Sequence, residues 1–449
     1  AMRRRVLLFI VPALSFVLIA TSLYLGRGHL TRIAWPTFAT EASDSSPDSA
    51  NVPPGVSSGA SSAASAPITV LDGTILSADR ITPYIKAIFD PEATDLPRLE
   101  CPPLNTSRYE PLRSSGSATP QIEYFFALDL RQCLPLLPRL LWSIVEAIRF
   151  LGPHRCVLSI VEGNSPDGTG DVLSALGPFL EDDLGLAYFY TPSVIDPSSA
   201  AGGSRIDSLA QLRNLALQPL VDRLAHASAS TTTILFINDV AACAEDLLEL
   251  ALQRRALGAD MACGMDWTYA GRDPTFYDVW VARRLDGDSF FEIPADGSWD
   301  SAWDLFRGDG GATRARFDAH LPFQVFACWN GAAAIGAGPV LGVDGGGGGG
   351  GLRFRAPRAG ECAQGEPQLF CKDLWFRGFG KIAVVPSVNL EHSDDRARDI
   401  KHLKGYTSDW ARGQTEEGNR IDWVLEPPEK VRCMPSWDNQ FWRPWNETL

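Results

Sequence analysis

Apolar stretches with two different periodicities alternate along the middle of the chain. Short apolar runs that are typical of buried strands occupy residues 123–130, 156–162, 186–190, 232–237 and 260–265. Amphipathic stretches with helical spacing lie between them, at residues 134–151, 205–224 and 247–257. Strands that alternate with helices predict a mostly parallel sheet with helices on both faces. The sequence therefore predicts an α/β fold.

The pattern changes beyond these elements. Residues 266–341 are rich in aromatic side chains and less regular, and we expect a flexible loop at the glycine run 344–351. Residues 369–376 then read as a helix and residues 381–390 as a strand. The tail, residues 400–449, is polar and rich in tryptophan, and we interpret it as irregular.

The amino-terminal end predicts a membrane protein. Arg3, Arg4 and Arg5 precede an apolar run, residues 6–26, that is long enough to cross a bilayer as a helix. The positive cluster would keep residues 1–5 in the cytoplasm and place the rest of the chain in the lumen. A cleaved signal peptide is the competing interpretation.

A stem and a luminal domain are expected after the membrane segment. Residues 27–74 include a long stretch of Ser, Ala, Pro and Gly, which cannot bury enough apolar surface to order itself. We interpret these residues as a flexible stem. The luminal domain would comprise residues 75–449, with a first half at 123–265, a second half at 266–400 and a carboxyl-terminal extension at 401–449.

Net charge, cysteine content and short motifs argue against several classes of protein. The chain has 449 residues and a formal net charge of −14, which argues against a nucleic-acid binder. Nine cysteines in an oxidising compartment would allow at most four internal pairs, and no CxxC pair suggests a zinc site. Glycosylation motifs at Asn105 and Asn446 suit a luminal chain. No GxGxxG follows the first predicted strand, which argues against a dinucleotide-binding dehydrogenase, and no GxxxxGK[ST] occurs, which excludes a P-loop protein.

Asn238 and Asp239 directly follow the apolar strand at 232–237. In an open α/β sheet, ligands bind beyond the carboxyl ends of the strands. A carboxylate there is a hard oxygen ligand for Mg²⁺ or Mn²⁺, and such a cation can bridge a diphosphate. The alternative is that Asp239 only caps the following helix.

Other polar residues near predicted strand ends extend this hypothesis. His392 follows the strand at 381–390 and would supply a second metal ligand, although a surface or capping histidine is the alternative. Several residues could grip a nucleoside or its phosphates; these candidate donor-binding residues are Glu162, Asn164, Asp167, Arg213, Asn214 and Asn238.

Trp329 and Asn330 are candidates for binding an acceptor sugar. Aromatic rings cover the apolar C–H patches of sugars, while neighbouring amides and carboxylates bind the hydroxyl groups. Tryptophan is equally common as a core residue, so packing is the competing interpretation.

The order and spacing of several segments resemble those of the fungal capsule-associated α-1,3-mannosyltransferases. The similar segments are Phe125–Leu128, Ile160–Ser165, Arg213–Asn214, Phe236–Val240, Leu369–Trp375 and Ala383–Leu390. The resemblance implies a GT-A fold, in which a Rossmann-type sheet binds a nucleotide sugar. It also implies a type II Golgi membrane protein that transfers mannose from GDP-mannose to the 3-hydroxyl of a mannoside, with the α-linkage retained and Mn²⁺ or Mg²⁺ as cofactor.

The resemblance leaves the catalytic group open. A retaining transfer needs no general base of the inverting kind, because the leaving diphosphate can take the acceptor proton. Glu361, Glu366 and Asp373 are candidates for orienting the acceptor or stabilising positive charge on the sugar, with ordinary loop or helix-terminal acids as the alternative. Position 237 is Ile where a full DxD motif has an acid. A transferase with another nucleotide sugar and a non-catalytic glycan-binding protein remain the competing functions.

Overall fold

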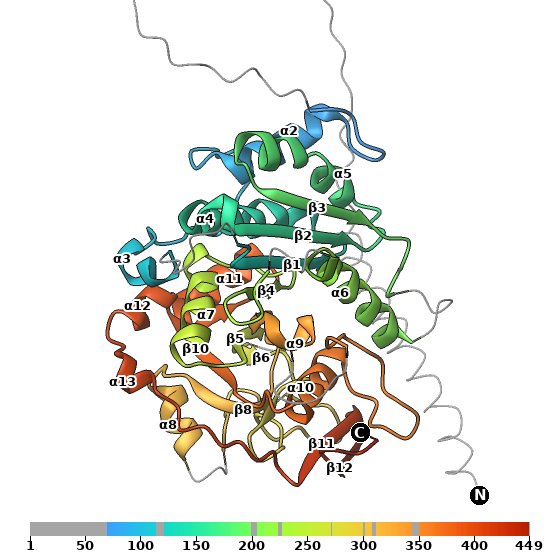
Figure 1. Cartoon of the computed structure of the whole chain (residues 1–449), viewed down its shortest axis with the longest axis vertical. Coiled ribbons are helices and arrows are strands. Elements are labelled where there is room, and N and C mark those ends of the chain that lie inside the picture. The colour runs from blue at the N-terminus through green and yellow to red at the C-terminus, as the bar shows by residue number, and fades with distance from the viewer. Residues whose placement is uncertain are drawn as a thin grey trace, which may run out of the picture. The chain divides into compact units, whose positions relative to one another are not determined.

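A sheet of mixed direction organises the fold (Figure 1). In this computed structural model the strands follow the order β3-β2-β1-β4-β9-β5-β10-β8-β7, and β6 pairs with β5. The strands of this sheet are β1 (Tyr124–Leu130), β2 (Cys156–Glu162), β3 (Ala187–Pro192), β4 (Thr233–Ile237), β5 (Met261–Thr268), β6 (Thr275–Phe276), β7 (Arg283–Arg284), β8 (Phe323–Ala327), β9 (Ala332–Gly336) and β10 (Ile382–Leu390).

The structure describes residues 70–113, 121–198, 204–222, 227–270, 272–299, 301–307, 311–343 and 350–448. All of these residues belong to one compact unit, residues 66–449. The predicted cytoplasmic tail, membrane segment and most of the predicted stem, residues 1–69, lie outside the described residues, as do residues 344–349 of the glycine run. Within the described part of the chain, no helix combines the length and the apolar character needed to cross a bilayer.

The sheet combines parallel and antiparallel pairs. β3, β2, β1 and β4 all run in one direction, and β5 and β10 pair parallel with each other. β9 lies antiparallel between β4 and β5, and β8 pairs antiparallel with β10. The five strands predicted within residues 123–265 thus share one direction, and the prediction of a mostly parallel sheet fails at β9 and β8. β9 reads Ala-Ala-Ala-Ile-Gly, a composition of low strand propensity, so the pairing with its two neighbours decides its conformation.

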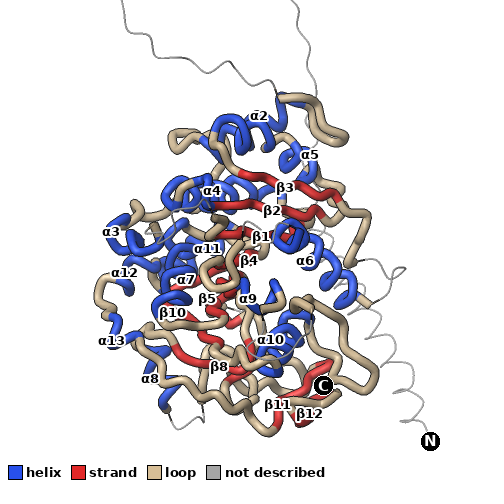
Figure 2. The backbone as a smooth tube through the Cα atoms, viewed as in Figure 1, coloured by secondary structure: helices blue, strands red, loops and turns tan. Residues whose placement is uncertain are grey.

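Helices cover both faces of the sheet, as predicted (Figure 2). α4 (Leu137–Leu151) and α7 (Ala244–Ala256) pack into one core, and α6 (Arg205–Asp222) and α10 (Glu366–Phe376) pack into the other. Side chains of a strand alternate between the faces of the sheet. In β1, Phe126 and Leu128 accordingly join the first core, while Phe125 and Ala127 join the second.

The first described residues are held by the domain. The Asp171 carboxylate accepts hydrogen bonds from the backbone N–H groups of Thr74, Ile75 and Leu76. Residue 74, the last of the predicted stem, is thus already fixed. α2 (Ala78–Phe89) follows and buries Ile81, Ile85, Ala87 and Ile88. Four other short α-helices are α3 (Thr106–Tyr109), α5 (Thr169–Ser174), α8 (Ala312–Asp318) and α9 (Ala337–Leu341).

The carboxyl-terminal tail is more regular than predicted. It contains α11 (Asp394–Lys404), α12 (Thr407–Ala411), α13 (Glu416–Asn419) and a hairpin of β11 (Lys430–Ser436) and β12 (Asn439–Pro444). The prediction of an irregular tail is wrong because these elements are polar and owe their order to contacts distant in sequence. One of these contacts is the disulfide Cys362–Cys433, which ties the hairpin to the loop before α10.

Three disulfides join segments that are distant in sequence. Besides Cys362–Cys433, they are Cys101–Cys243 and Cys263–Cys328. Three of these cysteines, Cys243, Cys263 and Cys328, lie in apolar runs that on their own suggest simple burial. Cys133, Cys156 and Cys371 are buried thiols. The three disulfides are of the kind that persists in an oxidising compartment.

Candidate active site

The candidate site lies where the sheet changes direction. β4 ends at Ile237, and the antiparallel β9 is its next neighbour. β10 ends at Leu390, and the backbone N–H of Ala241 donates to the carbonyl of Glu391 over 2.8 Å. This bond brings the segment after β4 beside the segment after β10. The carboxyl ends of strands at a change of strand order are the usual ligand site of open α/β sheets.

Asp239 and His392 meet at this place. His392 Nδ1 lies 3.1 Å from the carbonyl oxygen of Asp239 and 3.6 Å from its Oδ1. The Asp239 side chain is 48% exposed, so its carboxylate faces solvent. Asp239 does not cap α7, because that helix begins after Cys243 and its first turn is closed by the Asp246 side chain. The structure therefore does not support the capping interpretation of Asp239.

The His392 ring carries one nitrogen without a partner. His392 Nε2 is buried and has no hydrogen-bond partner among the described residues. Burial by itself lowers the pKa of His392, but the hydrogen bond and charge of Asp239, with Asp266 and Glu391, raise it to about 9. A metal ligand needs a neutral ring with one free nitrogen, and the partner of the other nitrogen fixes the tautomer.

These two residues fit a divalent cation that also binds substrate. Among the described residues, no cluster of three or more His, Cys, Asp or Glu side chains is arranged to hold a metal ion. Mg²⁺ and its relatives are commonly held by one or two protein groups plus substrate phosphates. Asp239 could supply a carboxylate to such a cation, and His392 could supply Nε2, which has no hydrogen-bond partner among the described residues, once that nitrogen loses its proton.

A buried arginine contacts several of the other side chains of the site. Arg213 of α6 is buried and its Nε lies 2.9 Å from Glu366 Oε1, while its Nη1 lies 3.6 Å from Asp129 Oδ1. The guanidinium also lies over the Trp329 ring, 4.5 Å from the centroid. Burial raises the pKa of Asp129 to about 6 against the opposing charge of Arg213. Arg213 therefore holds two acids from opposite sides of the site.

Asn238 and Trp329 are joined by a hydrogen bond. Trp329 Nε1 donates to Asn238 Oδ1 over 2.9 Å, and Arg213 Nη1 donates to the same oxygen over 3.4 Å. Asn330 lies in the turn between β8 and β9 with a left-handed φ of 55°. Its backbone N–H donates to Asp278 Oδ2 and its side chain to the carbonyl of Gly264. Asn330 is fully buried. Its hydrogen bonds stabilise the turn, and its side chain is not exposed to an acceptor sugar.

Two adjoining cavities contain most of these groups. One, of about 330 Å³, is lined by Asp129, Asp239 and His392, and the other, of about 360 Å³, by Trp329 and Glu366. They form two ends of one site because they share lining residues, namely Arg205, Leu209, Arg213, Asn238 and Tyr277. The predicted metal pair thus lies at one end, and a predicted acceptor residue and a predicted catalytic acid lie at the other.

The sequence reasoning missed three acids of this site. Asp129 is within β1, Asp266 is near the end of β5 and Asp278 follows β6. Asp266 is buried, its Oδ1 has no hydrogen-bond partner among the described residues, and burial together with Asp278 raises its pKa. Burial also raises the pKa of Asp278 to about 6. Asp129 and Asp266 carry the same signal as Asp239, an acid at the end of an apolar run.

Several predicted donor-binding residues are engaged elsewhere. Glu162 Oε1 accepts the backbone N–H of Ser165, and the Asp167 carboxylate accepts the N–H groups of Thr169 and Leu134. Asn214 forms two hydrogen bonds with the backbone of Phe354. Asn164 is exposed in the loop after β2. None of these four predicted residues lines either of the two cavities in the described structure, whereas Arg213 and Asn238 line both.

Glu361 and Asp373 are brought together with each other rather than with Asp239. The Arg355 guanidinium bonds both carboxylates, at 2.6 Å to Glu361 Oε2 and 2.7 Å to Asp373 Oδ2. Lys372 Nζ lies 2.6 Å from Glu361 Oε1. Burial opposes ionisation, but the hydrogen bonds from Arg355 and Lys372 lower the pKa of Glu361 to about 2. Of the three predicted catalytic acids, Glu366 is the one that lines the candidate site.

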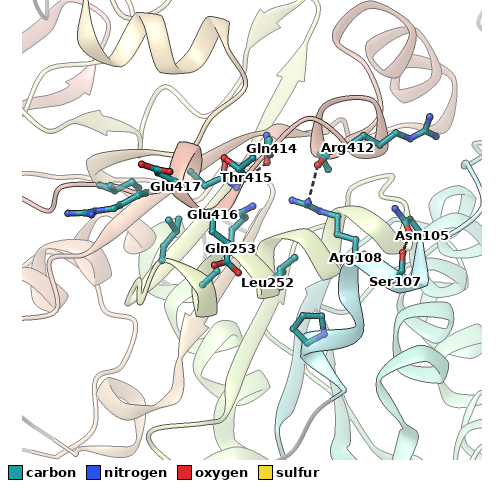
Figure 3. A pocket seen from close by; sticks show the side chains of 17 residues that line it. Asn105, Ser107, Arg108, Leu252, Gln253, Arg412, Gln414, Thr415, Glu416 and Glu417 are labelled. Atoms are coloured by element: carbon teal, nitrogen blue, oxygen red, sulfur yellow. Dashed lines mark hydrogen bonds between the residues drawn. The ribbon is translucent and has the colours of Figure 1, made fainter.

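A larger cavity of about 810 Å³ lies elsewhere (Figure 3). Its walls come from α3, from the carboxyl-terminal end of α7 and from the segment around α13, and they include Arg108, Gln253 and Glu416. The Arg108 guanidinium is bound by Glu249. Apart from the glycosylation motif at Asn105, none of the predicted site residues lines this cavity. The polar residues at the strand ends line the other two cavities.

Comparison with known proteins identifies the family. The model of the family described as Cryptococcal mannosyltransferase 1 matches residues 123–373. The chain belongs to this family. The alpha-1,3-mannosyltransferase CMT1 of Cryptococcus neoformans var. neoformans serotype D is 35% identical over 364 residues, which cover 76% of this chain and 75% of that protein. The family resemblance predicted from the sequence is confirmed, and this member of the Cryptococcal mannosyltransferase 1 family is an enzyme of the mannosyltransferase class.

Two solved structures show a distant likeness to the chain. Staphylococcus aureus TarS, residues 1–349, superposes with a TM-score of 0.34 at 13% identity, over 63% of this chain and 64% of that chain. The mannosyltransferase PcManGT of Pyrobaculum calidifontis, solved with GDP-Man and Mn²⁺, gives 0.33 at 13% identity, over 69% of this chain and 71% of that chain. Scores this low describe a distant likeness, and the family assignment rests on the sequence matches.

Proposed function

We propose that this member of the Cryptococcal mannosyltransferase 1 family transfers mannose from GDP-mannose to the 3-hydroxyl of an α-mannoside, with retention and with a divalent metal. The pairing of Asp239 with His392 at the end of the parallel half of the sheet carries the proposal. The name of the 35% identical relative, an alpha-1,3-mannosyltransferase, supports the linkage. The GDP-mannose donor and the retention come from the family resemblance.

Asp239 and His392 would hold Mn²⁺ or Mg²⁺ against the diphosphate of the donor. The cation, when bound, supplies a Lewis acid that stabilises charge on the leaving diphosphate. Asp239 contributes an exposed carboxylate, and the Asp239 carbonyl orients the His392 ring so that Nε2 is the free nitrogen. With an Ile at position 237, the protein offers these two groups rather than the two acids of a DxD motif.

Arg213 is a positioning residue in this scheme. Its charge is already matched by Asp129 and Glu366, so it does not offer a free cation to a phosphate. It fixes instead the Glu366 carboxylate and, through Asn238, the segment that carries Asp239. Side chains that are already held in position lower the entropic cost of aligning donor and acceptor.

Glu366 faces the place where the two substrates would meet. In the retaining step, the bond between the anomeric carbon and the diphosphate oxygen breaks, and the acceptor oxygen bonds the same face of that carbon. The acceptor proton passes to the leaving diphosphate oxygen. Glu366, held 2.9 Å from Arg213, would stabilise the positive charge that develops on the sugar.

The proposed place of action is the Golgi lumen, with the chain as a single-pass type II membrane protein. Arg3 to Arg5 followed by the apolar residues 6–26 support that orientation, and the three disulfides suit a luminal domain. Protease treatment of sealed microsomes containing the full chain would leave the domain protected until detergent is added. Digestion without detergent would contradict this orientation.

The reaction itself is tested with the full chain in detergent. Release of GDP from GDP-mannose is measured with methyl α-mannoside and Mn²⁺, Mg²⁺ or a chelator, and the product linkage is read by NMR. The proposal expects metal-dependent release and an α-1,3 product. Faster turnover of a UDP-sugar would overturn the donor assignment, and full activity in the chelator would overturn the metal.

A further inference from the structure

Two tryptophans, the exposed Trp280 and the half-buried Trp437, lie together at the Glu366 end of the site. Trp280 lines that cavity and is 36% exposed. Its ring centroid lies 4.3 Å from that of Trp437, with an angle of 39° between the planes. Trp437 rests in turn on Trp299, at 5.9 Å between centroids. The three rings form a cluster of tilted and edge-to-face contacts that begins at the cavity, with Trp437 and Trp299 partly buried against the core.

The hairpin of β11 and β12 holds Trp437 in this position. Gly297 has a φ of 72°, and a Cβ there would lie 2.9 Å from Trp437 Cδ1, so only glycine lets the ring approach this closely. Gln440 Nε2 donates to the carbonyls of Ile293 and Trp437. The disulfide Cys362–Cys433 fixes the base of the hairpin. The aromatic surface is therefore set before any ligand binds.

The cavity beside these rings has the chemistry of a sugar site. Asp266, Asp278 and Glu366 line it with carboxylates, and Gln364 adds an amide. Aromatic faces for C–H patches and acids for hydroxyl groups are what a hexose requires. Met434 and Pro435 of the hairpin complete the wall and lead from the cavity towards Trp437. A chain of sugars leaving the cavity on this side would pass over the aromatic pair.

We propose that Trp280 and Trp437 form a binding subsite for a mannose unit of the acceptor beyond the unit that reacts. This inference rests on the proposed function, because it takes the Glu366 cavity as the acceptor end. The subsite makes the enzyme prefer an α-mannooligosaccharide to a single mannoside. The competing occupant of the rings is the guanine base of the donor, which the experiment distinguishes.

The test compares two acceptors of different length. KM and kcat are measured for methyl α-mannoside and for a linear α-mannotetraoside, with the full chain and its Trp280→Ala and Trp437→Ala variants. We expect the wild-type KM to be lower for the tetraoside, and each variant to reduce that advantage about three- to tenfold, the usual contribution of one aromatic contact. Trp437→Phe, which keeps a ring face, should restore part of the advantage.

Trp442→Ala is the matched control. Trp442 lies on the same hairpin, is 43% exposed and lines neither cavity of the candidate site. It should leave the ratio of the two KM values within about twofold of wild type. A preference for the tetraoside that survives both Trp280→Ala and Trp437→Ala would overturn the subsite, and so would a rise confined to the KM for GDP-mannose. Absence of turnover with either acceptor in the wild type would instead count against the proposed function.

Discussion

His392 Nδ1 lies 3.6 Å from Asp239 Oδ1, although 153 residues separate the two in the chain. One residue follows β4 and the other follows β10. β9 and β5 separate these strands in the sheet, and the bridge between Ala241 and Glu391 joins the segments that follow them. In the proposed function, a cation would lie between this pair and the substrate. The following predictions test the roles of the groups around this pair.

Replacing His392 by Ala should weaken metal use more than it weakens the fold. Loss of the imidazole removes one of two proposed ligands, so we expect the Mn²⁺ concentration for half-maximal GDP release to rise at least about tenfold. Thermal unfolding checks that the domain is intact. His402, a titratable neighbour on α11 outside the two cavities, provides the control as His402→Ala. An unchanged Mn²⁺ requirement would refute the ligand role.

Replacing Arg213 by Met should destabilise the domain. The change leaves the buried carboxylates of Asp129 and Glu366 without their cation, and breaking a buried ion pair costs roughly 3–5 kcal/mol. Urea denaturation followed by tryptophan fluorescence measures the loss. Arg213→Lys keeps the charge but not the two-sided geometry, and it should lose less. Equal urea midpoints for Arg213→Met and wild type would show that Arg213 does not stabilise the charges of Asp129 and Glu366.

Glu366→Gln and Glu361→Gln should separate catalysis from stability. Glu366 lines the candidate site, so its change should lower kcat by about 10²-fold or more, as expected for a group that stabilises the transition state. Glu361 is bound by Arg355 and Lys372 away from those cavities, so its change should mainly lower the unfolding temperature. The reverse outcome, an active Glu366→Gln and an inactive but stable Glu361→Gln, would place the catalytic acid at Glu361.

Glu245→Gln should stabilise the protein increasingly as the pH rises. Burial, and next the neighbouring Asp246, raises the pKa of Glu245 to about 7 in the folded chain, with Ser408 and Lys401 opposing. A carboxyl whose folded pKa is raised favours folding below its unfolded pKa of about 4.3 and loses that contribution as the pH approaches 7. The gain of the variant at pH 8 over pH 5 should reach up to about 3 kcal/mol. Parallel stability curves for the two proteins across this range would contradict the shifted pKa.

The sequence was sufficient for the parallel half of the fold. The apolar runs at β1, β2 and β4 match strands, and the periodicity of 134–151 and 205–224 matches α4 and α6. β9 escaped prediction because its alanines have no strand preference of their own. The hairpin at β11 and β12 escaped prediction because the disulfide Cys362–Cys433 and contacts with Gly287 and Gly297 give it order.

The site followed from the sequence only where a polar residue ends an apolar strand. Asp239 and His392 satisfy that rule, and the structure brings them together. Glu361 and Asp373 have the same acidic chemistry, but nothing in the sequence shows that Arg355 binds both. Asp129 and Asp266 also stand at the end of apolar runs, although in the structure the strand continues past each of them. Which acids line the site depends on how segments distant in sequence pack together, and the sequence does not show this packing.

Metal-dependent binding of GDP tests the central claim most directly. Calorimetric titration of the full chain with GDP, with and without Mn²⁺, is compared between wild type and Asp239→Ala, whose exposed position should leave the unfolding temperature unchanged. We predict that Mn²⁺ tightens GDP binding to the wild type at least about tenfold and has no such effect on the variant. Equal tightening by Mn²⁺ in the two proteins would contradict a cation held at Asp239.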